Sequence, residues 1–136
     1  MQSDSLTAYR APRQKQKWLW FLCFIGPEPA AAEKIVYSTT LQRITTAKTR
    51  LERRFEADVV QELKAGATRD LAMGGPTLAA HAIRAGLVDE YHLLIAPVIA
   101  GGGNPYLPGK ISVKLELLDE RRFDNGLVYV RYRAKS

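Results

Sequence analysis

The stretch that decides the fold is GGPTLAAHAIRAGLVDEYHLLIAPVIAGGGNPYLP, residues 74–108. Its two leading glycines follow the apolar residues Leu71-Ala72-Met73. Pro76 then stands where the first residue of a helix is expected, because its fixed φ suits that position and its missing N–H costs nothing there. Gly86 is placed to end the same helix as a C-cap. A strand that ends in glycines and opens a helix presents backbone N–H groups at a positive dipole end, which suits a phosphate.

The common nucleotide fingerprints GxGxxG and GxxxxGK[ST] are absent, so the order of several shorter motifs carries the identification. These motifs are Gly74-Gly75, Gly86-Leu87-Val88-Asp89-Glu90, Pro97-Val98 and Gly101-Gly102-Gly103, with Ser38-Thr39-Thr40-Leu41 upstream after Lys34-Ile35-Val36-Tyr37. This order resembles the reductase domain of bacterial bifunctional riboflavin-biosynthesis deaminase–reductases and their stand-alone dihydrofolate-reductase-like relatives. The resemblance covers about residues 33–134.

The resemblance implies an α/β fold, with a dihydrofolate-reductase-like mixed sheet flanked by helices. It also implies an NADPH-dependent reductase of the 5-amino-6-(5-phosphoribosylamino)uracil reductase type, which transfers a hydride to a small molecule. NADPH would bind at two turns, whose residues are Ser38, Thr39, Thr40, Leu41 and Arg43 in the first and Gly74, Gly75, Pro76, Thr77 and Leu78 in the second. No metal is implied, and no catalytic residue can be named from the motifs.

Composition sets broad limits on the kind of protein. A chain of 136 residues with 46% hydrophobic residues is expected to form one globular domain with one core. Cys23 is the only cysteine, which excludes an internal disulfide and fits a reducing, cytoplasmic location. His81 and His92 are the only histidines, and neither has partners at a spacing typical of a zinc site or a Ser-His-Asp triad.

The positive charge is concentrated in the first part of the chain. Residues 1–54 hold ten Lys and Arg against four Asp and Glu, whereas residues 55–136 hold ten of each. No nucleic-acid-binding motif accompanies this bias, so a small anionic ligand is favoured over a nucleic acid as the partner. No membrane partner is expected.

The N-terminal segment differs from the family pattern. Residues 1–17 are expected to form a basic polar arm, and residues 18–136 the reductase domain. Trp18–Ile25 is an apolar run too short to span a membrane as a helix, and it is interpreted as a buried strand, with a secretory signal peptide as the alternative. Aromatic residues on both faces of this strand, together with the dimeric state of similar reductases, predict a homodimer.

Periodicity and turn residues predict two helices and six further strands after this run. Gly26-Pro27 and Asn125-Gly126 indicate turns, the second one a tight hairpin. The helices are expected at 56–65 and 76–85, and the strands at 34–38, 44–51, 70–73, 91–98, 113–122 and 127–133. The strand at 91–98 has apolar residues on both faces, which predicts a central position in the sheet.

The candidate residues also have purely structural interpretations. Ser38–Leu41 fits an ordinary strand-end turn in which hydroxyls satisfy the backbone, and Gly101–Gly103 fits a simple loop. Asp89 and Glu90 are neighbours on a strand and should point to opposite faces, so a paired-carboxylate site is disfavoured. His81 is interpreted as solvated and His92 as structural.

The family's substrate half begins with a strand that carries a Ser-x-Asp-Gly-like turn. No Asp-Gly pair occurs in this chain, and residues 1–33 match none of that half. Turnover is therefore expected to be very slow or nil, and the alternative function is that of a catalytically impaired member that keeps the fold as a cofactor-binding or interaction protein. Whether the N-terminus is native, truncated or frame-shifted is left open.

Overall fold

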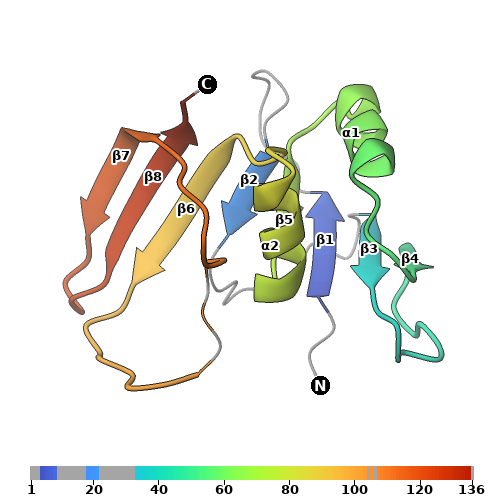
Figure 1. Ribbon diagram of the computed structural model, residues 1–136. Helices are drawn as coiled ribbons and strands as arrows, with labels where there is room; N and C mark the ends of the chain where they lie inside the picture. Colours follow the sequence, from blue (N-terminus) through green and yellow to red (C-terminus); the bar gives the residue numbers. More distant parts are fainter. Residues whose placement is uncertain (1–3, 9–17, 22–32, 104, 106, 136) are drawn as a thin grey trace.

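The computed structural model describes the backbone of residues 4–8, 18–21, 33–103, 105 and 107–135, and side chains from residue 33 onward. It contains a mixed sheet with two helices (Figure 1). The elements are β1 (Asp4–Ala8), β2 (Trp18–Phe21), β3 (Lys34–Tyr37), β4 (Thr49–Glu52), α1 (Ala57–Gly66), β5 (Leu71–Met73), α2 (Pro76–Arg84), β6 (Glu90–Ile95), β7 (Leu115–Arg122) and β8 (Val128–Ala134).

The sheet has eight strands in the order β4-β3-β1-β5-β2-β6-β8-β7. Strand β1 runs antiparallel to both of its neighbours, β3 and β5, so those two strands run in the same direction. Strands β5, β2 and β6 are parallel to one another, and β3 is parallel to β4. As a result β3, β4, β5, β2 and β6 all end at one edge of the sheet, which we call the carboxyl edge.

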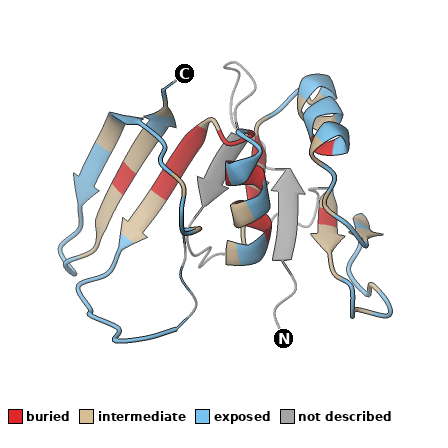
Figure 2. Cartoon of the chain, in the orientation of Figure 1, coloured by how far each residue is buried: buried red, intermediate tan, exposed pale blue. Residues whose placement is uncertain are grey.

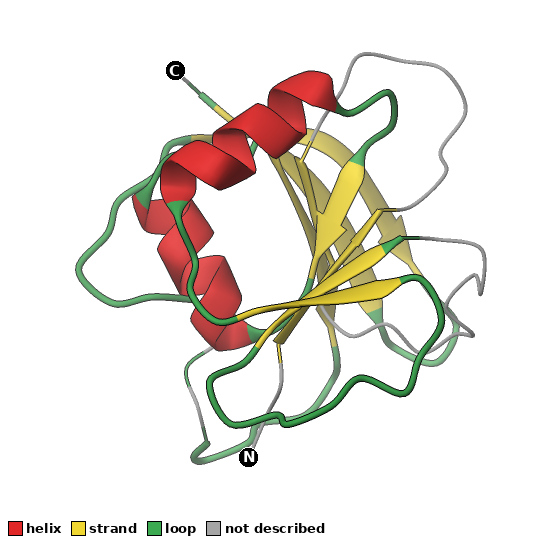
Figure 3. Ribbon diagram, turned by 90° about the vertical axis from the view of Figure 1, so that its right-hand side faces the viewer, coloured by secondary structure: helices red, strands yellow, loops and turns green. Residues whose placement is uncertain are grey.

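Both helices cover the same face of the sheet, which we call the helix face (Figure 3). Each joins two parallel strands, α1 between β4 and β5 and α2 between β5 and β6, and both crossovers advance in the same direction across the sheet. Right-handed crossovers of that kind place their helices on one face. The mixed α/β sheet with flanking helices is thus confirmed, and its two described helices lie on a single side.

The core lies between this face and the helices, where Figure 2 shows the buried residues of β5, β6 and α2. Helix α1 contributes Val60, and α2 presents small and branched residues at helical spacing. The buried core residues are Ile35, Val60, Leu71, Met73, Leu78, Ala79, Ala82, Ile83, Leu87, Val88 and Tyr91. The strand members occupy matched register positions, since Met73 is opposite Trp20, which is opposite Tyr91.

Local signals located several elements correctly. Helix α2 begins at Pro76 and ends before Gly86, whose φ of 67° and whose N–H bonded to the Ile83 carbonyl (3.0 Å) match the predicted C-cap. Strands β7 and β8 form the predicted hairpin, with Gly126 at φ 84° in the connection. Strand β6 is central, as predicted, and three consecutive residues from Glu90 to His92 are buried.

Three expectations about strands were wrong. Residues 44–48 are not in a strand, because Lys48 adopts φ 54° and the Thr46 and Thr49 hydroxyls bond to each other at 2.8 Å, so β4 begins only at Thr49. Strand β6 stops at Ile95 rather than Val98, since Pro97 has no N–H for the ladder. Asp4–Ala8, within the expected arm, forms β1, whose five residues are too short and polar to show a pattern.

Strand β2 confirms the first part of the expected strand at Trp18–Ile25, whose remaining residues lie outside the described part of the chain. Its backbone pairs with β5 on one side and β6 on the other, so it offers no free edge to a second copy. The homodimer and the cytoplasmic location stay predictions. None of the helices in the described residues is long and apolar enough to cross a membrane.

Candidate functional site

The two turns named from the sequence lie at the carboxyl edge. Ser38 follows β3 directly and Gly74 follows β5 directly, with β1 between these strands. Leu6 of β1 is opposite both Ile35 and Met73, which places Tyr37 at the level of Gly75 along the strands. Two strand spacings separate the turns, or roughly 10 Å. The structure therefore brings the two predicted segments to one edge and one level.

The first turn, Ser38–Leu41, is organised by its own hydroxyl. The backbone N–H groups of Leu41 (3.1 Å) and Thr40 (3.4 Å) donate to the Ser38 Oγ. The Ser38 hydroxyl thus satisfies backbone groups of its own turn, as in an ordinary strand-end turn. Thr39, Thr40 and Arg43 are exposed, so they are accessible to a ligand.

The second turn combines a left-handed glycine with a helix start. Gly75 is the N-cap of α2, with φ 96° and ψ 129°, a conformation that a side chain disfavours. Pro76 follows at the first helical position, and the first turn contains no acidic residue. In the part of the chain that the structure describes, a Cβ added to Gly74 meets no atom within 4 Å. Backbone N–H groups, a positive helix end and, among the described residues, open space beside Gly74 thus coincide here.

Arg53 is a site residue that the sequence interpretation missed. It follows β4, and its Nη1 donates to the carbonyl oxygens of Ser38 (3.0 Å) and Leu41 (2.7 Å). Arg43 is close to this turn in the sequence, whereas Arg53 reaches it through the parallel pairing of β3 with β4. That pairing is non-local, and the threonine-rich stretch before β4 misled the prediction of its start.

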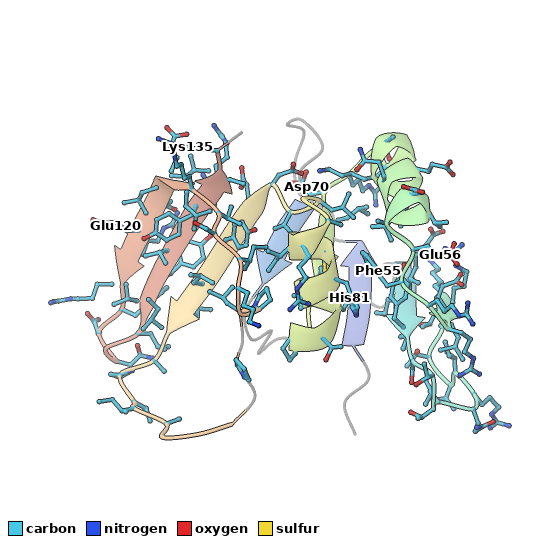
Figure 4. All side chains as sticks on the ribbon, viewed as in Figure 1. Phe55, Glu56, Asp70, His81, Glu120 and Lys135 are labelled. Atoms are coloured by element: carbon cyan, nitrogen blue, oxygen red, sulfur yellow. The ribbon has the colours of Figure 1, made fainter. Side chains whose placement is uncertain are left out.

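Three aromatic rings connect the end of β3 to α2 on the helix face. Phe55 lies 5.8 Å from Tyr37 at the end of β3, and 5.6 Å from His81 of α2, with the second pair stacked at 23° (Figure 4). His81 is exposed, as predicted, yet it has this structural contact. Burial and the neighbouring Glu52 raise the pKa of the Tyr37 phenol, so that ring stays neutral at ordinary pH.

Asp89 and Glu90 have different partners, as predicted, although Asp89 lies just before β6 and only Glu90 is in the strand. Lys64 of α1 donates to Asp89 Oδ1 at 2.8 Å and to the Leu87 carbonyl at 3.1 Å, which ties α1 to the start of β6. Glu90 is 2% exposed, with its Oε2 3.6 Å from His92 Nε2 and its Oε1 3.8 Å from an Arg133 guanidinium nitrogen. The two carboxylates therefore do not share a site.

His92 forms a polar chain on the face of the sheet opposite the helices. Its Nδ1 is hydrogen-bonded to the Tyr129 hydroxyl at 2.8 Å, while Glu90 lies beside its other nitrogen. Burial lowers the pKa of His92, and Glu90 opposes that shift only in part. His92 thus links β6 to β8, consistent with the structural role predicted for it.

The lowered pKa of His92 makes stability depend on pH. The unfolded histidine takes up its proton near its ordinary pKa of 6.5, before the folded one does, so stability should fall as the pH drops below 6.5. The slope for one group is at most about 1.4 kcal/mol per pH unit. Melting curves from about pH 5 to 8 should show this decline in the wild type and a flatter profile in His92→Gln. Equal slopes in the two proteins would contradict the assignment.

The candidate loop Gly101–Gly103 lies beyond the end of β6 and is exposed. Gly103 has φ 117°, so its backbone requires a glycine or strains any other residue. The neighbouring positions 104 and 106 lie outside the described residues. The loop contacts neither of the two turns through any hydrogen bond recorded for the described part of the chain.

Comparison with known proteins supports the fold. A putative riboflavin biosynthesis protein from Shewanella sp. PV-4 aligns with a TM-score of 0.64 at 21% identity, over 75% of this chain and 60% of that one. Acinetobacter baumannii RibD aligns with a TM-score of 0.53 at 17% identity, over 65% of this chain and 27% of that one. The dihydrofolate-reductase-like fold of the RibD reductase domain is therefore confirmed.

A sequence relative is the uncharacterized protein YyaP of Bacillus subtilis (strain 168), 36% identical over 75 residues, or 54% of this chain and 40% of that protein. This chain thus spans less than half of the length of YyaP. The family described as the RibD C-terminal domain matches residues 7–129, so the match extends into the N-terminal segment that the motifs left out. With most of its length covered, the chain belongs to the RibD C-terminal domain family.

Proposed function

We propose that this chain binds NADPH at the carboxyl edge of its sheet and serves as a reductase of the riboflavin-pathway type. The observation that carries the proposal is the placement of the two turns. Ser38–Leu41 and Gly74–Leu78 come from strands far apart in the sequence, yet they reach the same edge at the same level. Ligands of open α/β sheets bind at this edge.

The residues present fit a dinucleotide phosphate. A Cβ on Gly74 would occupy space that is open among the described residues, which supports close approach of a ligand to this backbone. The positive end of α2 would favour a pyrophosphate, and Arg43 with Thr39 would face the adenosine-side phosphate group of that pyrophosphate, which NADPH and NADH share. NADPH supplies a hydride when bound, and these residues would hold and orient it.

We propose the substrate only as a chemical class. Proteins named for riboflavin biosynthesis and for RibD share the fold, which favours a phosphorylated ribosylaminopyrimidine as the acceptor. The chain spans only part of those proteins, and its sequence has no Asp-Gly pair to form the family's substrate-side turn. Hydride transfer requires the acceptor to be held against the cofactor in a fixed geometry. We therefore expect binding of NADPH with very slow or no reduction of that acceptor.

Two measurements test this proposal on the full chain. Titration with NADPH, followed by fluorescence or calorimetry, should show saturable binding of weak to moderate affinity. NADPH absorbance should then stay nearly constant when the ribosylaminopyrimidine is added. Brisk oxidation would show that the chain completes a substrate site, whereas binding without oxidation supports the cofactor-binding alternative. Failure to bind NADPH would remove both candidates.

A further inference from the structure

Arg53 holds both ends of the first cofactor turn with one guanidinium nitrogen. Its Nη1 lies 3.0 Å from the Ser38 carbonyl oxygen and 2.7 Å from the Leu41 carbonyl oxygen. Hydrogen bonds from a charged donor are stronger than those between neutral groups. The four-residue turn is therefore closed from inside by Ser38 Oγ and from outside by Arg53.

The position of Arg53 follows from the sheet. Strands β3 and β4 are parallel with Tyr37 opposite Glu52, and the Ser38 N–H donates to the Glu52 carbonyl at 3.0 Å. Arg53, the residue that follows β4, therefore lies beside the turn. Two residues later, Phe55 packs against Tyr37 and stacks on His81 of α2. The segment 53–55 thus makes two contacts. Its arginine contacts the first turn, and its phenylalanine contacts α2, the helix that begins in the second turn.

The bonds to Arg53 also determine where the turn's free donors point. In a trans peptide the carbonyl and the N–H of the same peptide unit point in opposite directions. The carbonyls of Ser38 and Leu41 point to Arg53, so the N–H groups of Thr39 and Gln42, which share those peptide units, point away from it. The N–H groups of Thr40 and Leu41 are directed instead to Ser38 Oγ.

We propose that Arg53 is a positioning residue of the cofactor site, which aims the Thr39 and Gln42 N–H groups at a phosphate without contacting the ligand itself. This inference rests on the proposed binding of NADPH. Because Arg53 acts on the turn and not on one particular phosphate, it should contribute equally to the binding of NADPH and of NADH, which lacks the 2′-phosphate. A residue that reads the 2′-phosphate would affect NADPH alone.

The test compares Arg53→Ala, Arg53→Lys and Arg54→Ala in the full chain. Arg54 is the adjacent exposed arginine, and its replacement removes the same charge. Arg53→Ala should weaken binding of both NADPH and NADH by about tenfold, corresponding to about 1.4 kcal/mol. Arg54→Ala should change neither affinity by more than about twofold, and Arg53→Lys should recover part of the loss by bonding to one carbonyl. The difference between the two alanine variants should persist at high salt, where surface charges are screened.

Each result is decisive. Equal weakening in the two alanine variants would show a general charge effect and overturn the inference. Loss of NADPH affinity alone in Arg53→Ala would make Arg53 a phosphate contact and also overturn it. Unchanged affinity of Arg53→Ala for both dinucleotides would overturn the inference as well, whatever the melting temperature of that variant. Wild-type protein that does not bind NADPH would instead refute the proposed function, and with it the ligand role of the turn.

Discussion

Replacement of Gly74 with valine is expected to reduce NADPH affinity by about 100-fold or more while the protein remains folded. In the described part of the chain a Cβ at this position meets nothing within 4 Å, which favours retention of the fold. The same space is where the proposed pyrophosphate approaches the backbone. A branched side chain there would keep the phosphate from the N–H groups at the start of α2, and each tenfold loss corresponds to about 1.4 kcal/mol.

The matched control is Gly66→Val. A Cβ added to Gly66 also meets no atom of the described residues within 4 Å, but Gly66 ends α1 before β5 begins, at the edge opposite the site. Calorimetric titration should give near wild-type affinity for Gly66→Val and no measurable heat for Gly74→Val. Both should melt cooperatively. Wild-type affinity in Gly74→Val would remove the second turn from the site.

Gly75, the other glycine of the second turn, is a less informative position for this test than Gly74. Its φ of 96° disfavours every side chain, and most of all a β-branched one. A valine there would impose strain of roughly 1–3 kcal/mol on the strand-to-helix junction. Lost binding in Gly75→Val would then reflect a distorted backbone as much as a filled space.

The features that could be predicted from the sequence are those determined by neighbours in the chain. Pro76 and Gly86 mark the ends of α2 because each acts through its own φ and the adjacent hydrogen bonds. Asn125-Gly126 marks the hairpin for the same reason, with the Leu127 N–H bonded to Asn125 Oδ1 at 3.2 Å. In these places local chemistry and the final structure agree.

The features that could not be predicted depend on pairing between distant segments. Strand β1 is held by hydrogen bonds to β3 on one side and β5 on the other, and these partners cannot be predicted from the residues of Asp4–Ala8. Arg53 reaches the first turn only because β4 lies parallel to β3. The β-branched threonines at the start of β4 and just before it predict that the strand begins earlier than it does. The two turns could thus be placed at one edge of the sheet from the sequence, whereas the contact of Arg53 with the first turn depends on the topology.

The strongest effect on stability is expected at Glu90, which is outside the cofactor site. Its carboxylate is 2% exposed on the face opposite the helices, between His92 on its own strand and Arg133 on β8. His92 extends this contact to the Tyr129 hydroxyl. The polar chain therefore connects central strand β6 to the hairpin, in addition to the backbone ladder between β6 and β8 and the packing of Tyr132 and Ala134 against the core.

Glu90→Ala should lower the free energy of unfolding by about 2–4 kcal/mol, because it leaves a cavity and removes the carboxylate that lies beside the His92 imidazole and the Arg133 guanidinium. The melting temperature should fall by roughly 10 °C. Glu120→Ala is the control, since Glu120 is exposed on β7 and its truncation should cost less than about 0.5 kcal/mol. Glu90→Gln keeps the shape and should fall between the two. If denaturant unfolding found Glu90→Ala as stable as the control, the carboxylate would not be a structural link between β6 and β8.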